Sequence, residues 1–392
     1  MRRVFLIVLD SFGIGEMPDA NYYHDGGSNT LRAISTSDSF FIPTLEKMGL
    51  MAIDGVQIAK NQQEMMAGYQ GCVARMTEES KGKDTTMGHW EISGVVSQKP
   101  LPTFPNGFPE ELVHKLEKAT GRKILCNLPY SGTKVIEDYG EEQVKSEALI
   151  VYTSADSVLQ IAAHESVIHV EQLYEYCRMA RALCTGKYGV GRVIARPFVG
   201  EKGHYIRTAK RHDFSLEPPK CTMLDQLVEA GYEVHAVGKI NDIFAGRGIT
   251  SSRPTKGNEE GIAVTLNLLD QDFTGLCFVN LVDFDMLYGH RNDVDGYAKA
   301  MSYFDYKLSE IINKLRKDDI LMITADHGCD PTTPSTDHSR EYTPLVMYGE
   351  SLKKGINLGT RSSFADIGAT ILDYFEVEPK VTGTSFLKDI VR

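Results

Sequence analysis

Short runs of β-branched and aliphatic residues alternate along the chain with amphipathic stretches, and this alternation limits the folds open to it. An apolar run of about four to eight residues between turn residues is typical of a buried strand. Strands separated by helices favour a mainly parallel sheet with helices on both faces, because parallel strands need a crossover connection. We expect strands at residues 4–9, 149–152, 192–195, 233–237, 276–282 and 320–324.

Two stretches have the apolar spacing of amphipathic helices. The clearer one lies between Gly296 and Lys317, with Asp295 as the expected N-cap. The second is expected near residues 109–120, with Gly121 ending it. The apolar positions of the first helix are Met301, Phe304, Leu308, Ile311, Ile312 and Leu315.

Two proline-rich segments suggest how the 392 residues divide into domains. Prolines concentrate in residues 100–109 and again at 218–219, and roughly 115 residues lie between them, enough for an inserted domain. We therefore expect a discontinuous core domain, 1–99 with 217–392, and an inserted domain, 100–216. The alternative is one large domain with two ordinary proline loops.

Composition excludes several classes of protein. With 42% hydrophobic and 24% charged residues the chain can bury a core, so wholesale disorder is excluded. A net charge of −11 argues against nucleic acid as a partner. No apolar run approaches the ~18 residues of a membrane span, so no membrane association is expected. The seven cysteines form no C-x-x-C pair, which favours a reducing cytoplasm.

Acidic residues and histidines follow three of the predicted strands. Asp10 follows the first, Asp283 and Asp285 follow the fifth with His290 nearby, and Asp326-His327 follow the sixth, ahead of Asp337-His338. Ligands in α/β proteins bind beyond the carboxyl ends of strands, so these side chains are expected to converge. Carboxylate with imidazole suits Mn²⁺ or Zn²⁺. Taken singly, each Asp is more typical of a turn or a helix cap.

Two further segments suggest phosphate chemistry. Residues 82–91 (GKDTTMGHWE) contain hydroxyls beside Lys83 and glycines, where a metal-activated nucleophile could meet a phosphate, although alone the segment is simply a polar loop. Residues 186–212 hold seven Lys or Arg and one acid. Prolines and glycines between these charges argue against a DNA-reading helix, and a phosphate-bearing small molecule fits them better than nucleic acid. The alternative is a solvated surface.

Long motifs make the chain resemble the phosphopentomutases of the alkaline phosphatase superfamily almost from end to end. They are Asp10-Ser11 with GIG (13–15), GKDT with GHWE (82–85, 88–91), YTSADSVLQIAAHE (152–165), GRVIARPFVG (191–200), NLVDFD with GHR (280–285, 289–291), TADHG (324–328), TDH (336–338) and FADIGAT (364–370). The resemblance implies an α/β fold: an alkaline-phosphatase-like core, with a mainly parallel sheet flanked by helices, and an inserted smaller α/β cap domain.

The resemblance also implies a site with two Mn²⁺ ions. Asp10, Asp326, His327 and the phosphorylated hydroxyl of Thr85 would hold one ion. The other ion would be held by Asp285, His290 and His338. Residues that would surround the sugar phosphate, mostly in the cap, are Ser154, Asp156, Arg192, Ile194, Arg207 and Lys239.

The implied reaction interconverts ribose 1-phosphate and ribose 5-phosphate, and the 2-deoxyribose phosphates, through a phosphothreonine enzyme and a 1,5-bisphosphate. A sugar bisphosphate could serve as activator, and the sequence gives no oligomeric state. The alternatives are a two-metal phosphatase or phosphoglycerate mutase of the same superfamily, or a non-catalytic sugar-phosphate sensor. Two positions depart from the family pattern: Thr86 lies next to Thr85, and Cys329 stands where asparagine is typical.

Overall fold

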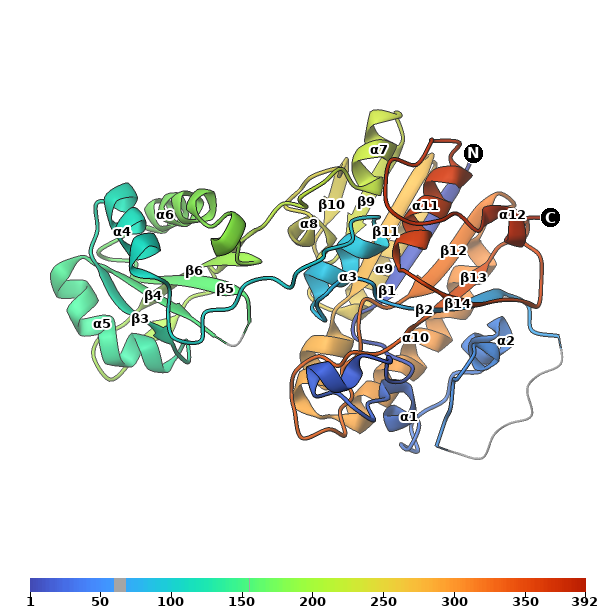
Figure 1. The fold of residues 1–392 in the computed structure, drawn as a ribbon, viewed down its shortest axis with the longest axis horizontal. Coiled ribbons are helices and arrows are strands. Elements are labelled where there is room, and N and C mark those ends of the chain that lie inside the picture. Colours follow the sequence, from blue (N-terminus) through green and yellow to red (C-terminus); the bar gives the residue numbers. More distant parts are fainter. Residues whose placement is uncertain (60–67, 155) are drawn as a thin grey trace. The chain divides into compact units, whose positions relative to one another are not determined.

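The computed structural model describes residues 1–59, 68–154 and 156–392, and their contacts divide them into two compact units. Unit 1 comprises Met1–Pro100 and Pro218–Arg392, and unit 2 is Leu101–Glu217 (Figure 1). The boundaries predicted from the prolines lie one residue from these limits. The role of unit 2 as a substrate-binding cap stays a prediction.

A mainly parallel sheet forms the centre of unit 1 and confirms the predicted fold class. In the described residues it has eight strands, and only β13 runs against its neighbours. Neither β13 nor its neighbour β2 was among the predicted strands. The strand order is β10 (Ser251–Arg253), β9 (Glu233–Val237), β11 (Gly275–Leu281), β1 (Arg3–Leu9), β12 (Asp319–Thr324), β13 (Thr343–Tyr348), β2 (Cys72–Met76) and β14 (Ile356–Arg361).

Strand β1 lies in the middle of this sheet and is buried along its whole length. It pairs in parallel with β11 on one side and β12 on the other, with Leu9 beside Leu281 and Val8 beside Thr324. Because these three strands are in register, their carboxyl ends meet at one edge of the sheet. The polar residues that follow each strand therefore leave from the same edge.

Helices cover both faces of the sheet in unit 1 (Figure 1). Helices α9 and α10 contribute to the core on the face that carries Phe5 and Ile7, while on the other face Phe278 contacts the rings of His89 and Phe244. The helices of unit 1 are α1 (Thr30–Ile34), α2 (Pro43–Met48), α3 (Thr85–Ile92), α7 (Met223–Glu229), α8 (Ile240–Ile243), α9 (Asn258–Leu269), α10 (Val294–Lys314), α11 (Ala365–Tyr374) and α12 (Leu387–Ile390), with 3-10 turns at Ala20–Tyr23, Leu50–Ala52 and Gly289–Arg291 and a π-helical turn at Phe284–Tyr288.

The predicted long helix exists as α10, but its N-cap was predicted wrongly. Asp293, not Asp295, lies outside the helix and accepts a hydrogen bond from the Gly296 backbone N–H at 2.9 Å. Asp295 lies inside the first turn, where an acidic side chain interacts favourably with the helix dipole. The helix ends at Lys314, three residues before the predicted Lys317.

Unit 2 is a smaller α/β unit with its own core. Its sheet, within the described residues, runs β3 (Ile124–Pro129), β4 (Leu149–Thr153), β5 (Val158–His164), β6 (Arg192–Val199), β7 (Ile206–Arg207), with β8 (His212–Ser215) also paired to β6. Apolar side chains of α4 (Glu110–Thr120) and α6 (Val170–Leu183) fill one face, and those of α5 (Lys134–Ser146) fill the other. The predicted helix near 109–120 is confirmed as α4, and Gly121 caps it with a φ of 67°.

Candidate functional site

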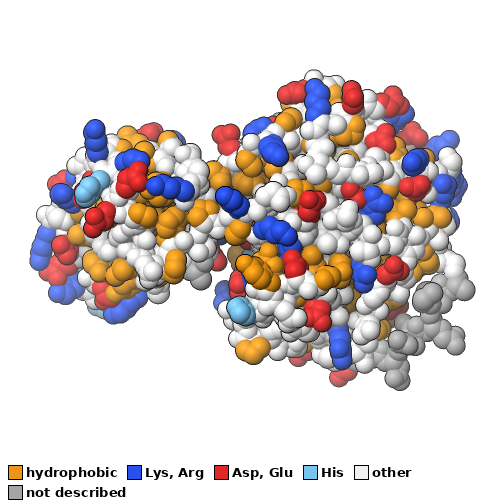
Figure 2. Space-filling model, in the orientation of Figure 1, with side chains coloured by type: hydrophobic (Ala, Val, Ile, Leu, Met, Phe, Trp, Pro, Cys, Tyr) orange, Lys and Arg blue, Asp and Glu red, His pale blue; other side chains and the backbone are white. Residues whose placement is uncertain are grey.

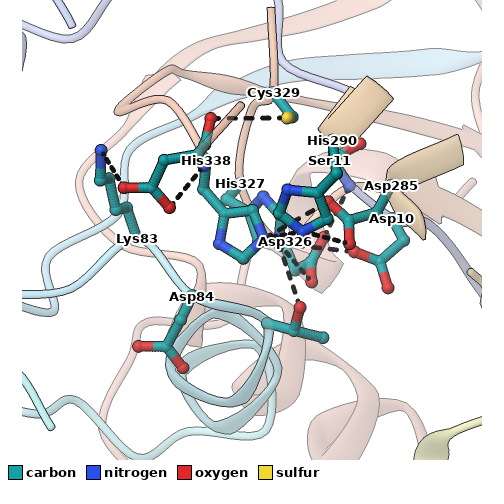
Figure 3. A network of polar contacts seen from close by, with 12 residues as sticks. Asp10, Ser11, Lys83, Asp84, Asp285, His290, Asp326, His327, Cys329 and His338 are labelled. Carbon is teal, nitrogen blue, oxygen red and sulfur yellow. Dashed lines mark hydrogen bonds and ion pairs between the residues drawn. The ribbon is translucent and has the colours of Figure 1, made fainter. Parts of the chain in front are cut away.

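The six predicted metal ligands lie together at the carboxyl edge of the sheet in unit 1 (Figure 3). Asp10 directly follows β1, and Asp326-His327 come two residues after β12. Asp285 lies in the π-helical turn after β11, and His290 lies in the 3-10 turn that follows. His338 returns to the site because Gly328 and Ser339 pair through backbone hydrogen bonds of 3.1 and 2.8 Å, which closes the loop between them.

One cluster gathers around the Nε2 atom of His327. This atom lies 3.4 Å from Asp10 Oδ1 and 3.3 Å from Asp326 Oδ2. The hydroxyl of Thr85 lies 3.3 Å from the same nitrogen. Asp10, Asp326 and His327 are almost completely buried, whereas Thr85 is half-buried. We call it the Asp10 cluster.

A second cluster, the Asp285 cluster, comprises Asp285, His290 and His338. Its three side chains contact one another at nearly equal distances, with His290 Nε2 3.2 Å from Asp285 Oδ2, His338 Nε2 3.3 Å from Asp285 Oδ1, and the two Nε2 atoms 3.2 Å apart. Tetrahedral ligands about 2.1 Å from an ion lie ~3.4 Å from one another. The ring centroids of His327 and His338 are 3.9 Å apart, so the two clusters adjoin.

Backbone carbonyls orient two of the histidines. The Nδ1 atom of His327 lies 3.0 Å from the Gly328 carbonyl oxygen, and Nδ1 of His290 lies 2.6 Å from the Thr336 carbonyl oxygen. A ring that donates from Nδ1 keeps a lone pair on Nε2, which is the atom turned toward the carboxylates in both cases. This is the arrangement that metal-binding histidines use.

Three carboxylate oxygens of the two clusters are buried and accept no hydrogen bond: Asp10 Oδ1, Asp285 Oδ1 and Asp326 Oδ2. A buried charged oxygen without a hydrogen bond is costly, and a divalent cation would satisfy it. The donor set of carboxylates and imidazoles suits Mn²⁺ or Zn²⁺. The residues present therefore fit the binding of divalent metal, which agrees with the metal prediction at that level.

Electrostatic interactions in the Asp10 cluster shift the pKa values of its two carboxyl groups in opposite directions. Burial and the neighbouring Asp326 raise the pKa of Asp10. Burial would also raise the pKa of Asp326, but His327 and His89 outweigh it and lower that pKa below its usual value. Burial opposes protonation of His327, yet Asp326 and Asp10 raise its pKa well above the usual value. The cluster thus holds protons that a divalent cation would displace.

The Asp285 cluster behaves in the same way. The hydrogen bond between His290 and Asp285 raises the pKa of His290 to about 9, although burial opposes this. Burial would raise the pKa of Asp285, but His338 and His290 lower it well below the usual value. The carboxylate is therefore ionised and ready to bind a cation, whereas His290 must first lose its proton.

Helix α3 holds Thr85 at the Asp10 cluster. Asp84 caps the helix by accepting hydrogen bonds from the backbone N–H groups of Thr86 and Met87 at 3.1 and 3.2 Å. Gly88 lets α3 closely approach the segment that follows β12, because a Cβ there would lie 2.2 Å from the Asp326 carbonyl oxygen. The contact with His327 is made by Thr85, the hydroxyl that the resemblance implies, and not by the adjacent Thr86.

Two polar groups that were not predicted as ligands contact the Asp10 cluster. Asn280 donates to Asp10 Oδ2 at 2.8 Å, and its Nδ2 lies 3.3 Å from His89 Nε2. The Ser11 backbone N–H donates to Asp326 Oδ1 at 3.1 Å. The Lys83 ammonium group lies 3.1 Å from a carboxylate oxygen of Asp25 and 3.1 Å from one of Asp337, at the rim of the site (Figure 3). The sequence offers one sign of a role for Asn280, because this polar residue stands near the end of an otherwise apolar strand.

The predicted substrate residues divide between the units. Lys239 precedes α8 in unit 1, while the other five lie in unit 2. Arg192 and Ile194 are on β6, Arg207 is on β7, and Ser154 follows β4. The Ser154 hydroxyl accepts a hydrogen bond from the Asp156 backbone N–H at 3.3 Å.

Acidic side chains elsewhere in unit 2 pair with much of the basic stretch 186–212. Lys187 pairs with Glu111, Lys202 with Glu141, Lys210 with Glu165 and Arg211 with Asp213, at 2.6 to 3.2 Å. Figure 2 shows blue and red side chains interspersed on the visible surface. Arg192 also lies 3.5 Å from Asp213. The stretch is therefore less positive in the fold than its sequence suggests.

Within the described residues, no helix is both long and apolar enough to cross a bilayer. All seven cysteines fall within the described ranges and are unpaired.

Comparisons with known proteins agree with the geometry. The profile of the Metalloenzyme superfamily matches residues 2–379. A phosphopentomutase of Lachnoclostridium phytofermentans is 64% identical over 392 residues, covering 100% of both chains. One of Carboxydothermus hydrogenoformans is 58% identical over 391 residues, again covering 100% of both.

A solved structure shares the fold at low sequence identity. The phosphoglycerate mutase of Leishmania mexicana superposes with a TM-score of 0.50 and 11% identity, covering 98% of this chain and 97% of that one. The likeness concerns the fold alone. With full-length relatives above half identity and a metalloenzyme profile across nearly all its residues, the chain belongs to the phosphopentomutase family of the alkaline phosphatase superfamily.

Proposed function

We propose that this enzyme interconverts ribose 1-phosphate and ribose 5-phosphate, and the 2-deoxyribose phosphates, through a phosphothreonine at Thr85 and a 1,5-bisphosphate. One observation carries the proposal. The hydroxyl of Thr85 lies 3.3 Å from His327 Nε2, next to a buried cluster whose carboxylates include oxygens without hydrogen bonds. A nucleophile beside a two-metal site is the arrangement that phosphoryl transfer requires.

Two Mn²⁺ ions are the cofactors we propose. Asp10, Asp326 and His327, with the phosphorylated Thr85, would hold one, and Asp285, His290 and His338 the other. The ions would neutralise the charge of the phosphoryl group and polarise its oxygens. Three histidines among the ligands favour Mn²⁺ over Mg²⁺, which prefers oxygen and retains its waters.

The residues of the chain position the reacting groups. The capped first turn of α3 fixes Thr85, and the close approach at Gly88 fixes α3 against the Asp326 backbone. The bond from phosphorus to Thr85 Oγ1 breaks as a bond forms to the free sugar hydroxyl, and the proton of that hydroxyl passes to the released Thr85 oxygen. After the sugar bisphosphate reorients, its other phosphate returns to Thr85. Trace sugar bisphosphate would rephosphorylate an enzyme that had lost its phosphate.

Unit 2 would act as the cap that binds the phosphate not being transferred. We propose Ser154, Asp156, Arg192, Ile194 and Arg207 for this role, with Lys239 from unit 1. Arg207 Nη1 and the Tyr152 hydroxyl both lie close to Gly132, 2.9 and 3.0 Å from the position that a Cβ on this glycine would take. The Tyr152 hydroxyl is buried and has no hydrogen-bond partner, so an anion beside Arg207 could accept a hydrogen bond from it. A cap also limits hydrolysis by keeping water out.

Side-by-side assays would test the proposed substrate. Turnover of ribose 5-phosphate, 3-phosphoglycerate and a generic phosphomonoester is compared, together with intact mass and phosphosite mapping of the purified protein. The proposal expects mutase activity on the pentose phosphate and one phosphate on Thr85. Preferred turnover of 3-phosphoglycerate, release of inorganic phosphate as the main reaction, or binding without turnover would contradict it.

A cytoplasmic location is also proposed, because seven unpaired cysteines fit a reducing compartment.

A further inference from the structure

We propose that Cys329 turns the Asp285 cluster into a site for thiophilic divalent metals, where Asp285, His290 and the Cys329 thiolate bind Zn²⁺ or Cd²⁺ together. This inference rests on the proposed metal site at Asp285 and His290. It adds a sulfur ligand that the Mn²⁺ set does not use, and it leaves His338 outside the new set.

The three donors lie close together. A carboxylate oxygen of Asp285, a ring nitrogen of His290 and the Cys329 sulfur all lie within 4.8 Å of one another. Zinc binds sulfur at about 2.3 Å and nitrogen or oxygen at about 2.1 Å, so a tetrahedral site holds such donors ~3.4 to 3.6 Å apart. Side-chain movements of about 1 Å therefore bring all three donors to one ion.

Independent contacts fix the sulfur beside the cluster. A Cβ on Gly289 would lie 2.9 Å from Cys329 Sγ, so the glycine preceding His290 makes room for the thiol against the turn that carries this ligand. The thiol is 1% exposed, and its hydrogen bond is a long one, 3.5 Å to the Asp337 carbonyl oxygen (Figure 3).

One carboxylate oxygen of Asp285 also lacks a hydrogen-bond partner. Asp285 is 4% exposed, and its Oδ1 accepts no hydrogen bond. A cation held by this carboxylate and by the sulfur would neutralise the buried charge. The cluster thus offers more than an isolated cysteine.

The chemistry of sulfur sets the preference among metals. Thiolate ligands select soft or borderline ions such as Zn²⁺ and Cd²⁺, whereas Mn²⁺ prefers oxygen and nitrogen. Binding replaces the thiol proton, which leaves to solvent as the metal–sulfur bond forms. Since the same carboxylate and imidazole would serve Mn²⁺, the two kinds of metal compete for one place.

Cadmium reports sulfur ligation directly, without turnover. Metal-free full-length enzyme is titrated with Cd²⁺, and the ultraviolet thiolate-to-cadmium charge-transfer band is followed for the wild type and for Cys329→Ser. Cys221→Ser serves as the control, since Cys221 is partly exposed and belongs to none of the metal-binding groups. We expect a saturable band in the wild type and in Cys221→Ser, and its loss in Cys329→Ser.

Affinity gives a second measurement. The ratio of the Kd for Mn²⁺ to that for Cd²⁺ should fall in Cys329→Ser by at least the roughly tenfold that loss of an outer partner costs a metal site. The ¹¹³Cd NMR shift of the wild type, in the range of sulfur ligation, tests the idea even if the variant folds poorly.

The outcomes separate this inference from the proposed function. Stoichiometric Cd²⁺ binding without the band, or a band that persists in folded Cys329→Ser, overturns the role of Cys329 and leaves the metal site standing. Failure of the wild type to bind either Cd²⁺ or Mn²⁺ overturns the metal site itself. Asp285→Asn should weaken the binding of both metals.

Discussion

Thr85 combines a reactive group with a fixed position. Its hydroxyl lies 3.3 Å from His327 Nε2, and its carbonyl oxygen lies 2.8 Å from His89 Nδ1. Since His89 Nδ1 is also 3.1 Å from Asp326 Oδ2, one histidine connects the backbone of Thr85 to the Asp10 cluster. This coupling distinguishes Thr85 from Thr86, whose backbone N–H contacts the capping Asp84.

Thr85→Ala should therefore abolish mutase turnover while leaving metal content and fold largely intact, because removal of one partly exposed hydroxyl costs little stability. Steady-state assays, elemental analysis and thermal unfolding check this expectation. Thr86→Ala is the matched control and should keep its turnover. Near-normal interconversion by Thr85→Ala, or phosphate mapped to Thr86, would sink the assignment.

Removal of metal should remove activity. We expect a strong chelator to abolish turnover and Mn²⁺ to restore it better than Mg²⁺, because three of the proposed ligands are histidines. Asp326→Asn deletes a buried charge of the Asp10 cluster and should lower the number of metals bound per chain. Elemental analysis beside activity assays decides the matter. Full activity with a chelator present and no bound metal would refute the prediction.

Metal affinity should rise with pH. The hydrogen bond to Asp285 raises the pKa of His290 to about 9, so below that pH the ring carries a proton that the metal must displace. Each displaced proton changes the apparent affinity by about tenfold per pH unit, and affinity increases until the pH reaches the pKa. Mn²⁺ titrations of metal-free enzyme at roughly pH 6, 7 and 8 measure this slope. An affinity independent of pH would contradict the proton displacement.

The sequence predicted the ligand candidates because each follows a strand or belongs to an Asp-His pair, and strand ends meet at one edge. Contacts between segments far apart in the sequence were not predicted. Asn280 contacts Asp10 across two strands, and Lys83 contacts Asp25 and Asp337 from a loop. Such pairings depend on the tertiary fold, so spacing in the sequence gives little sign of them.

Among the elements of unit 1, α3 has little room against the backbone that follows β12. A Cβ on Gly88 would lie 2.2 Å from the backbone carbonyl oxygen of Asp326, an atom that cannot rotate away. Any added side chain must therefore shift α3, and with it the Thr85 hydroxyl, relative to the Asp10 cluster.

Gly88→Ala should thus destabilise the fold by about 1–3 kcal/mol, the usual cost of overpacking, and should lower kcat strongly. Denaturant unfolding and steady-state kinetics measure the two effects. Gly261→Ala in α9 is the control, since its Cβ would meet side-chain atoms and no backbone, Leu281 Cδ2 at 2.9 Å and Thr255 Oγ1 at 3.8 Å. Equal stability and kcat of the two variants would show that α3 can move away from the Asp326 backbone without loss.

The accuracy of the predicted elements followed the strength of their patterns. The apolar spacing of α10 and the buried run of β1 predicted both elements well, because burial on a helical stripe or on both faces of a strand marks the sequence. The N-cap failed because Asp293 and Asp295 differ only in backbone geometry, which composition does not reveal. The reversed direction of β13 likewise depends on its neighbours β12 and β2.

On the scale of the whole molecule, each unit has a separate core, so substitutions in unit 2 should leave the metal clusters of unit 1 intact. The prolines at 100–109 and 218–219 predicted this division because few helices or strands continue through such segments. The ion pairs of the basic stretch could not be predicted, since the acids Glu111, Glu141 and Glu165 lie far away in the sequence.

Two arginines of unit 2, Arg192 and Arg207, are proposed to bind the phosphate that is not transferred. Arg207 is exposed on β7, near the buried Tyr152 hydroxyl. Arg192 on β6 lies 3.5 Å from Asp213 on β8. A charge-assisted Arg–phosphate contact is worth about 1.5–3 kcal/mol, so its loss should weaken productive binding by roughly ten- to a hundredfold. Arg192→Ala and Arg207→Ala should lose kcat/KM for ribose 5-phosphate by that factor and keep their metals.

Lys202→Ala provides the control for that prediction, because Lys202 belongs to the same basic stretch but pairs with Glu141 at 2.6 Å on the surface. Loss of an exposed pair changes little, so its kcat/KM should stay within about twofold of the wild type. Arg207→Ala should also retain slow hydrolysis of the phosphothreonine, since water needs no phosphate clamp. If all three variants match the wild type, the arginines only solvate the surface of unit 2, and other residues must hold the substrate.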